Sequence, residues 1–266
     1  MCMKINVLII VLLTTLIEPS LYATLPGGPP GEGGEFPASR FYANFDTTAC
    51  HYWTLGTNSF VSETSLNLAW NVNCDYIHPF NGRVTSKFGK RRRRMHYGID
   101  IDLETGDKVQ VAFEGMVRYA KYNDSYGNLV VVRHPNGLET YYAHLSALHV
   151  QAGDYVQAGD IVGLGGNTGR SYGAHLHFEI RFLGIPIDPA LVIDFDKMTL
   201  RYTDVILNKR KDRIIVENAA RYHQVLPGED IYSISRLYQV QVGELCRLNH
   251  MQPDEPVLVD MRIRYQ

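Results

Sequence analysis

Cysteine is scarce in this chain: Cys2, Cys50, Cys74 and Cys246 are the only four among 266 residues. Four thiols cannot form a dense disulfide framework. A hydrophobic core must therefore stabilise the fold. The chain also lacks a strong net charge, because its formal value is −2 with His neutral. No global basic field therefore points to nucleic acid, and no nucleic-acid partner is predicted.

The apolar run at the N-terminus is too short for a membrane helix, which needs about 20 residues. It covers residues 5–17, follows Lys4 and is followed by a small residue, Ala23. This pattern is typical of a secretory signal peptide, so we predict one over residues 1–23, with an uncleaved anchor as the alternative. The mature protein is then expected to be exported and to have no stable membrane span. Its location is the periplasm, the cell envelope or the extracellular space.

Export permits disulfide formation. Removal of the signal peptide leaves Cys50, Cys74 and Cys246, an odd number, so at least one thiol stays unpaired within the chain. Cys50 and Cys74 are the candidate pair. Cys246 lies in a helical pattern and is expected to be a buried thiol.

The composition divides the first two thirds of the chain into three parts. Residues 24–37 are rich in Pro and Gly and are predicted to form a flexible linker. Residues 38–75 carry many aromatic side chains and form a predicted N-terminal extension. From 76 to 195, short Val- and Tyr-rich runs alternate with Gly turns, and no long helical period occurs. This pattern predicts a mainly β fold, an antiparallel β-sheet domain with few helices.

One hairpin is predicted in detail. Residues 128–133 and 138–143 are β-branched and aromatic runs on either side of a turn that contains Asn136 and Gly137. Asn-Gly favours such turns because both residues tolerate positive φ.

The last third contains a predicted connector and a small module. Residues 196–218 carry mixed charges and are predicted to connect two domains. Within residues 219–266, strand patterns enclose two stretches with helical apolar spacing. This β-α-α-β outline predicts a separate C-terminal module.

Five residues have the types and spacing of a hydrolytic metal site: His96, Asp100, His144, His175 and His177. Residues i and i+2 of a strand share a face, so His175 and His177 can converge on one metal or one substrate. Catalytic zinc sites use three protein ligands and leave the fourth position to water. A neutral His beside that water can accept its proton. The other histidines are expected to be surface or structural residues.

Three motifs resemble those of the lysostaphin-type (LytM) zinc endopeptidases, in the same order. They are SKFG at 86–89 with HYGID at 96–100, YYAHL at 141–145, and GGNTGRS at 165–171 running into GAHLHFE at 173–179. Ile187-Asp188-Pro189 resembles the usual end of that domain. The resemblance covers residues 76–192 and implies a zinc peptidase domain over 76–195.

The resemblance implies a role for each of the five residues. His96, Asp100 and His177 match zinc ligands, and His144 and His175 match the two catalytic histidines. One of these two acts as general base and the other stabilises the oxyanion; the sequence does not assign which. All five positions are intact, which favours an active enzyme. A basic loop at 90–94 precedes the first ligand and is either solvated or a clamp for carboxylates.

Residues 222–265 resemble a LysM module. The resemblance rests on the following positions: Val225, Gly228, Asp230, Ile231, Ile234, Tyr238, Leu245 and Asn249. It implies that residues 219–266 bind a glycan that contains N-acetylglucosamine. Ile231 stands where the family usually has Thr or Ser after the turn Asp, which weakens the case for a helix cap there.

Together the two resemblances imply a secreted zinc-dependent endopeptidase that hydrolyses peptide bonds in peptidoglycan stem peptides or cross-bridges. One alternative is a catalytically inactive wall-binding scaffold or activator of another hydrolase. Another is a metal-dependent enzyme that acts on a non-wall peptide. The bond cut and the oligomeric state stay open. An inhibitory role of residues 38–75 also stays open; if they block the site, deleting 24–75 should raise activity.

Overall fold

The computed structural model describes residues 37–39, 41–51, 63–69, 76–92, 94–210, 213–219 and 221–266. The predicted signal peptide lies outside these residues, as does the linker up to residue 36. Cys74 is also outside them, so the candidate Cys50–Cys74 disulfide is not described. Among the helices in the described ranges, none is both long and apolar enough to cross a membrane.

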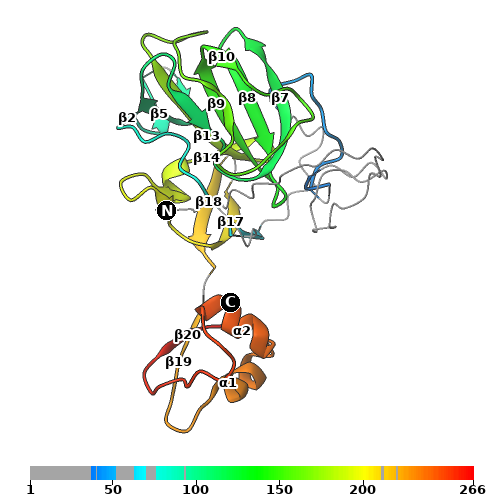
Figure 1. Ribbon diagram of the computed structural model, residues 1–266, viewed down its shortest axis with the longest axis vertical. Helices are drawn as coiled ribbons and strands as arrows, with labels where there is room; N and C mark the ends of the chain where they lie inside the picture. The colour runs from blue at the N-terminus through cyan, green and yellow to red at the C-terminus, as the bar shows by residue number, and fades with distance from the viewer. Residues whose placement is uncertain are drawn as a thin grey trace, which may run out of the picture.

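An antiparallel sheet of eight strands forms the upper part of the molecule in Figure 1. Its order is β11-β7-β8-β9-β13-β5-β2, and β14 pairs with β13 outside this path. The strands are β2 (Val84–Ser86), β5 (Ile99–Asp102), β7 (Gly115–Asn123), β8 (Gly127–Arg133), β9 (Leu138–Leu145), β11 (Tyr155–Val156), β13 (His175–Phe182) and β14 (Ile185–Ile187). The prediction of a mainly antiparallel β fold with few helices is confirmed.

Smaller sheets complete this body. They are made of β1 (Glu63–Asn67), β17 (Asp204–Arg210) and β18 (Arg213–Asn218); of β6 (Lys108–Gln110), β10 (Ala147–Leu148) and β12 (Ile161–Leu164); of β3 (Gly89–Lys90) and β4 (Met95–His96); and of β15 (Ile193–Asp194) and β16 (Thr199–Leu200). A 3-10 turn, η1 (Pro189–Leu191), precedes β15. The predicted connector thus contains a hairpin, and its Val205, Leu207, Ile214 and Val216 pack into the main core.

The side chains of β13 alternate between an apolar face and a polar face of the sheet. Successive side chains of a strand point to opposite faces. Leu176, Phe178, Ile180 and Phe182 alternate along β13, are fully buried and belong to the main core. The residues between them, His175, His177, Glu179 and Arg181, therefore share the other face. That second face therefore carries the polar and charged side chains of β13.

Residues 41–51, the N-terminal strap, begin against the main core, where Tyr42 is buried, and then run along this second face. The strap is the blue segment beside β7 in Figure 1. The guanidinium of Arg118 donates to the carbonyl oxygens of Asp46, Ala49 and Cys50 at 2.7–2.8 Å. The guanidinium of Arg133 donates to the Asn44 carbonyl at 2.8 Å. The strap is therefore anchored through its backbone to charged side chains of the sheet.

These two arginines share one buried carboxylate. Glu139 Oε1 accepts from Arg118 Nε at 2.6 Å and from Arg133 Nε at 2.9 Å. All three side chains are fully buried. Charged groups are tolerated in an interior only when they are paired and hydrogen-bonded, which is the case here.

The predicted hairpin is confirmed. β8 and β9 pair as antiparallel strands, and Gly137 in the turn has a φ of +93°. His134 opens the turn and is fully buried, with Nδ1 2.8 Å from the Glu114 carbonyl and Nε2 2.8 Å from the Thr140 hydroxyl. It is a structural histidine, as expected.

Acid is expected to destabilise the protein through His134. Burial lowers the pKa of this imidazole to about 4, below the ordinary value of 6.5. Its stabilising contribution is therefore complete above about pH 6.5 and is lost as the pH falls towards 4, about 3 kcal/mol in total. Urea unfolding at pH 7.5 and 4.5 should show a smaller pH dependence in a His134→Gln variant than in the wild type. Equal dependence in both would contradict this assignment.

The C-terminal unit has the predicted β-α-α-β order, with β19 (Tyr222–Gln224), α1 (Ile231–Tyr238), α2 (Val242–Asn249) and β20 (Arg262–Arg264). It has its own core, which includes Ile231, Ile234, Leu245 and the buried thiol of Cys246. The expected weak helix cap is wrong. The Asp230 carboxylate accepts from the Ser233 amide at 2.6 Å, and the Ser233 hydroxyl accepts from the Asp230 amide at 2.9 Å, which completes a capping box.

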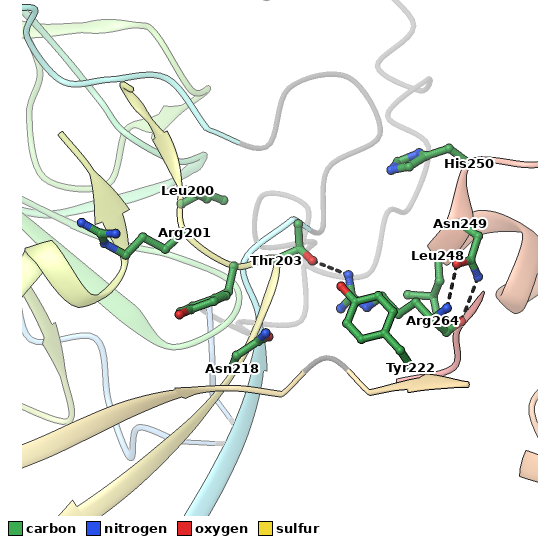
Figure 2. A pocket seen from close by; sticks show the side chains of 10 residues that line it. Leu200, Arg201, Thr203, Asn218, Tyr222, Leu248, Asn249, His250 and Arg264 are labelled. Carbon is green, nitrogen blue, oxygen red and sulfur yellow. Dashed lines mark hydrogen bonds between the residues drawn. The ribbon is translucent and has the colours of Figure 1, made fainter. Parts of the chain in front are cut away.

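Arg264 at the end of β20 links the C-terminal unit to the segment before β17. It donates to the Thr203 hydroxyl at 2.6 Å (Figure 2). It also forms an ion pair with Asp204, the first residue of β17. A hollow of about 430 Å³ lies at this junction, with Tyr202, Tyr222 and His250 in its wall. The predicted site residues lie in the upper body and not at this junction.

Candidate metal centre and catalytic cleft

The register of β5 against β13 brings two of the three predicted ligands together. Asp100 on β5 lies directly opposite His177 on β13. Directly opposed residues of an antiparallel pair project from the same face with their Cβ atoms about 5 Å apart. Gly98 precedes β5 and passes close to β13, because a Cβ there would lie 2.3 Å from the Phe178 carbonyl. The glycine in HYGID thus allows the chain to carry His96 over the same spot.

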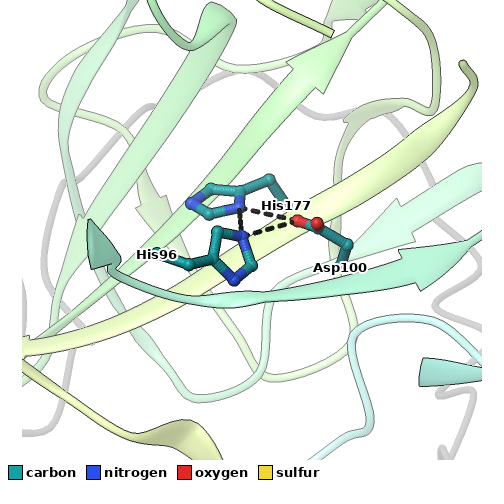
Figure 3. Close-up of side chains that lie close together, drawn as sticks. All are labelled: His96, Asp100 and His177. Atoms are coloured by element: carbon teal, nitrogen blue, oxygen red, sulfur yellow. Dashed lines mark hydrogen bonds and ion pairs between the residues drawn. The ribbon is translucent and has the colours of Figure 1, made fainter. Parts of the chain in front are cut away.

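Three ligand atoms meet at this spot (Figure 3). Asp100 Oδ1 lies 2.8 Å from His177 Nδ1 and 3.1 Å from His96 Nε2, and the two imidazole nitrogens are 3.1 Å apart. The described residues form one group of His, Cys, Asp and Glu side chains able to hold a metal ion, and it consists of these three. The predicted ligand set is therefore assembled.

Hydrogen bonds on the outer side orient both imidazoles. His96 Nδ1 lies 2.9 Å from the Lys87 carbonyl, an acceptor, and 3.3 Å from the Arg91 guanidinium, a donor; the shorter contact, to Lys87, forms a hydrogen bond when Nδ1 carries the proton. His177 Nε2 lies 2.9 Å from Glu179 Oε1. In the neutral rings, His96 Nε2 and His177 Nδ1 then turn lone pairs towards Asp100. Three converging lone pairs favour a bound cation.

The charges around this cluster shift the pKa values of its members. Burial alone would raise the pKa of Asp100, but hydrogen bonds from His177 and His96 hold it well below its usual range. Burial alone would lower the pKa of His177, but its hydrogen bonds to Asp100 and Glu179 raise it to about 9. A proton on His177 thus occupies the place that a cation would take, so the two compete.

A β-bulge turns His144 towards the cluster. The register of β8 and β9 shifts between Asn128 and Val130, and His144 has a φ of +63°. Bulges insert one residue and re-aim a side chain. Tyr142 and Leu145 point into the main core, and the inserted residue projects to the opposite face. The ring centroid of His144 lies 5.8 Å from that of His177.

His144 and His175 face each other beside the metal-ligand group. Their ring centroids are 4.7 Å apart, and His175 Nε2 lies 3.6 Å from Asp100 Oδ1. Each Nδ1 donates to a backbone carbonyl, Thr168 at 2.7 Å and Gly173 at 2.8 Å, so each neutral ring keeps its lone pair on Nε2. Burial lowers the pKa of His144 to about 4. Near neutral pH, His144 is therefore an unprotonated base.

The cluster opens into a cleft of about 830 Å³. The five predicted residues line it together with aromatic side chains (Tyr97, Tyr126 and Tyr172), basic ones (Arg91, Arg94 and Arg170) and the end of the strap (Cys50 and His51). Tyr172 is 97% exposed, so its ring is open to a ligand. Arg93 of the predicted basic loop lies outside the described residues.

Sequence reasoning missed several residues at the site. Glu179, Arg181 and Tyr126 lie behind His177, and His51 of the strap lies 5.6 Å from the Tyr126 ring. The alternation of HLHFEIRF could have identified two of them, because Glu179 and Arg181 continue the face of His175 and His177. No signal in the sequence identified the contribution of the strap.

Comparisons with known proteins agree with the two-part organisation. Residues 94–189 match Peptidase family M23, and residues 223–264 match the LysM domain. The DD-carboxypeptidase/endopeptidase Mpg of Neisseria meningitidis serogroup B is 42% identical over 116 residues, 41% of this chain and 27% of that protein. The peptidoglycan DD-endopeptidase ShyC of Vibrio cholerae is 32% identical over 158 residues, 59% of this chain and 34% of that protein.

The chain spans only 27% and 34% of the lengths of these two proteins. Among solved structures, the catalytic domain of lysostaphin from Staphylococcus simulans is 31% identical and has a TM-score of 0.40. That likeness covers 41% of this chain and 90% of the lysostaphin domain. All five predicted site residues fall inside the matched range. The family models thus identify a Peptidase family M23 domain over residues 94–189 and a LysM domain over residues 223–264.

Proposed function

We propose that the protein is a secreted zinc-dependent endopeptidase that hydrolyses peptide bonds in peptidoglycan stem peptides or cross-bridges. The arrangement of three metal-ligand atoms beside two histidines that present Nε2 carries this proposal. The signal peptide predicted over residues 1–23 would export it to the periplasm or cell envelope or beyond.

The donor set fits zinc. Two imidazole nitrogens and one carboxylate oxygen are ligands that Zn²⁺ accepts, and three protein ligands are typical of catalytic sites. Zn–N bonds of about 2.0–2.1 Å place tetrahedral ligand atoms about 3.3 Å apart. The separations of 2.8–3.1 Å in the cluster of His96, Asp100 and His177 are close to that spacing. When bound, zinc would polarise the scissile carbonyl and lower the pKa of water.

The protein groups around the cluster supply the proton chemistry. In the neutral form, His144 and His175 each present the lone pair of Nε2, so either can take a proton from the attacking water. The protonated ring can then stabilise the oxyanion or release its proton to the leaving amine. The geometry makes both histidines competent for both roles.

The cleft and the LysM domain fit a wall polymer. Stem peptides carry carboxylates, and arginine binds carboxylates in a bidentate manner. Arg94 and Arg170 line the cleft and are exposed. The LysM domain would bind the N-acetylglucosamine-containing glycan and raise the local concentration of scissile bonds. Because Mpg is named a DD-carboxypeptidase/endopeptidase and ShyC a peptidoglycan DD-endopeptidase, a DD cross-link is the first bond to test.

Mature, zinc-loaded protein is expected to release fragments from purified peptidoglycan, with loss of cross-linked muropeptides in mass spectra. A His175→Ala variant should lose this activity, because its imidazole lies beside the ligand cluster. The position of the lost cross-link identifies the bond.

A matched control is His149→Ala, which removes an exposed imidazole outside the cleft. It should cleave like the wild type. Wild-type protein that binds zinc but cleaves no wall fragment would refute the endopeptidase proposal and support a wall-binding scaffold. Cleavage of unrelated peptides alone would instead support a non-wall substrate.

A further inference from the structure

A second carboxylate, that of Glu179, contacts the predicted ligand His177 on the side away from Asp100. Glu179 is 1% exposed and lies two residues along β13, on the same face. Its Oε1 is 2.9 Å from His177 Nε2, the ring nitrogen that points away from Asp100. The imidazole is thus held between two carboxylates, one on each nitrogen.

Two further groups fix the orientation of Glu179. The Tyr126 hydroxyl donates to Oε1 at 2.9 Å, and Arg181 Nε donates to Oε2 at 2.6 Å. Arg181 also lies 3.2 Å from the Tyr126 hydroxyl and donates to the Gly184 carbonyl at 3.1 Å. Both oxygens of the carboxylate therefore have partners, and the charge of Glu179 is balanced by Arg181.

The contact determines where His177 can carry its proton. A neutral imidazole has one N–H and one lone pair, and an ionised carboxylate can only accept. The tautomer with the proton on Nε2 donates to Glu179, whereas the other tautomer would place a lone pair against the carboxylate. Metal-ligating histidines commonly donate their other N–H to a carboxylate, which fixes the ring and raises its basicity.

We propose that Glu179 is a positioning residue of the metal site. Held by Tyr126 and Arg181, it keeps the proton of His177 on Nε2 and leaves Nδ1 for the metal. This inference depends on the metal site of the proposed function. It gives a role to Glu179, the last residue of the GAHLHFE motif, and to Tyr126 and Arg181, which lie outside the three motifs.

A purely structural role is the competing explanation, since Glu179 also neutralises a buried arginine. The chain offers a matched comparison in Glu139. That side chain is also buried and paired with arginines, but its partners are Arg118 and Arg133, and no hydrogen bond to the ligand cluster is found among the described residues. Glutamine at either position removes a buried charge, and only the change at 179 acts on His177.

The test compares Glu179→Gln with Glu139→Gln in the full chain. A glutamine amide can donate or accept, so it no longer selects one tautomer of His177. Zinc affinity is measured by competition with a chromogenic chelator at a temperature where circular dichroism shows both variants folded. We expect Glu179→Gln to weaken zinc binding about 10–100-fold and Glu139→Gln to leave it unchanged. Nitrogen-15 NMR of the zinc-loaded protein should place the His177 proton on Nε2 in the wild type and show a changed pattern in Glu179→Gln.

Tyr126→Phe keeps the charge of Glu179 and removes one of its hydrogen bonds, so it serves if Glu179→Gln does not fold. It should weaken zinc binding less than Glu179→Gln does, yet measurably. Equal zinc affinity in wild type, Glu179→Gln and Tyr126→Phe would overturn the inference. Because the readout is zinc affinity, wall cleavage can fail while the inference holds, and the inference can fail in an enzyme that cleaves the wall.

Discussion

A His144→Ala variant is expected to keep its zinc and to lose about 10²–10⁴-fold in kcat, the usual contribution of a positioned acid or base. His144 is outside the ligand group, and its Nδ1 is held by the Thr168 carbonyl, which leaves the lone pair of the neutral ring on Nε2. A His177→Ala variant should lose zinc and activity together, because it removes one of three ligand atoms. Metal content by elemental analysis and muropeptide release measured on the same samples separate the two outcomes.

The pH profile provides an independent check on His144. Burial lowers the pKa of its imidazole to about 4, so the base form persists well below neutral pH.

Zinc loss in His144→Ala would place it among the ligands and contradict the assignment. Near-wild-type turnover in a zinc-loaded His144→Ala protein would instead remove it from the reaction.

Local rules made part of the ligand cluster accessible from the sequence, although the register of β5 against β13, which sets Asp100 opposite His177, joins residues far apart in the chain. Alternation along a strand puts His175 and His177 on one face, and the motif glycine lets Asp100 and His96 approach them. The position of His144 was not accessible in this way. A regular strand would point it into the core with Tyr142, and only the bulge, with its positive φ, brings it to the site. There the family resemblance supplied what periodicity could not.

Long-range packing set a second limit. The strap contributes backbone carbonyls to Arg118 and Arg133, and backbone carbonyls leave no trace in a sequence pattern. The pairing of β1 with β17 joins residues far apart in the chain and depends on tertiary structure. Composition therefore identified residues 38–75 as an extension but could not show that described parts of it belong to the peptidase body.

Deleting residues 1–51 is expected to lower the melting temperature on the order of 10 °C, whereas deleting residues 1–36 should leave it nearly unchanged. Loss of the strap removes four carbonyl acceptors from Arg118 and Arg133. Breaking a buried charge network typically costs about 3–5 kcal/mol. For a body of this size, each kcal/mol lowers Tm by about 2–4 °C. Calorimetry on both truncations measures the difference.

A Tyr42→Phe variant tests the strap without a truncation. The buried Tyr42 hydroxyl donates to the Gly137 carbonyl at 2.8 Å and accepts from the Leu183 amide at 3.0 Å. Its loss should destabilise the body by about 1–3 kcal/mol, because the Leu183 amide is left without that acceptor. An unchanged melting temperature would show that the strap is not firmly held.

The truncations also decide whether the extension inhibits the enzyme. An inhibitory segment predicts higher activity once it is removed, whereas a structural strap predicts a less stable and less active protein. Cys50 and His51 line the cleft, yet the strap is anchored to buried charges that need its carbonyls. We therefore expect the 1–51 deletion to cleave peptidoglycan less well than the 1–36 deletion. A folded, zinc-loaded 1–51 deletion with the higher activity would show the reverse: a removable cover, with Arg118, Arg133 and Glu139 stable without it.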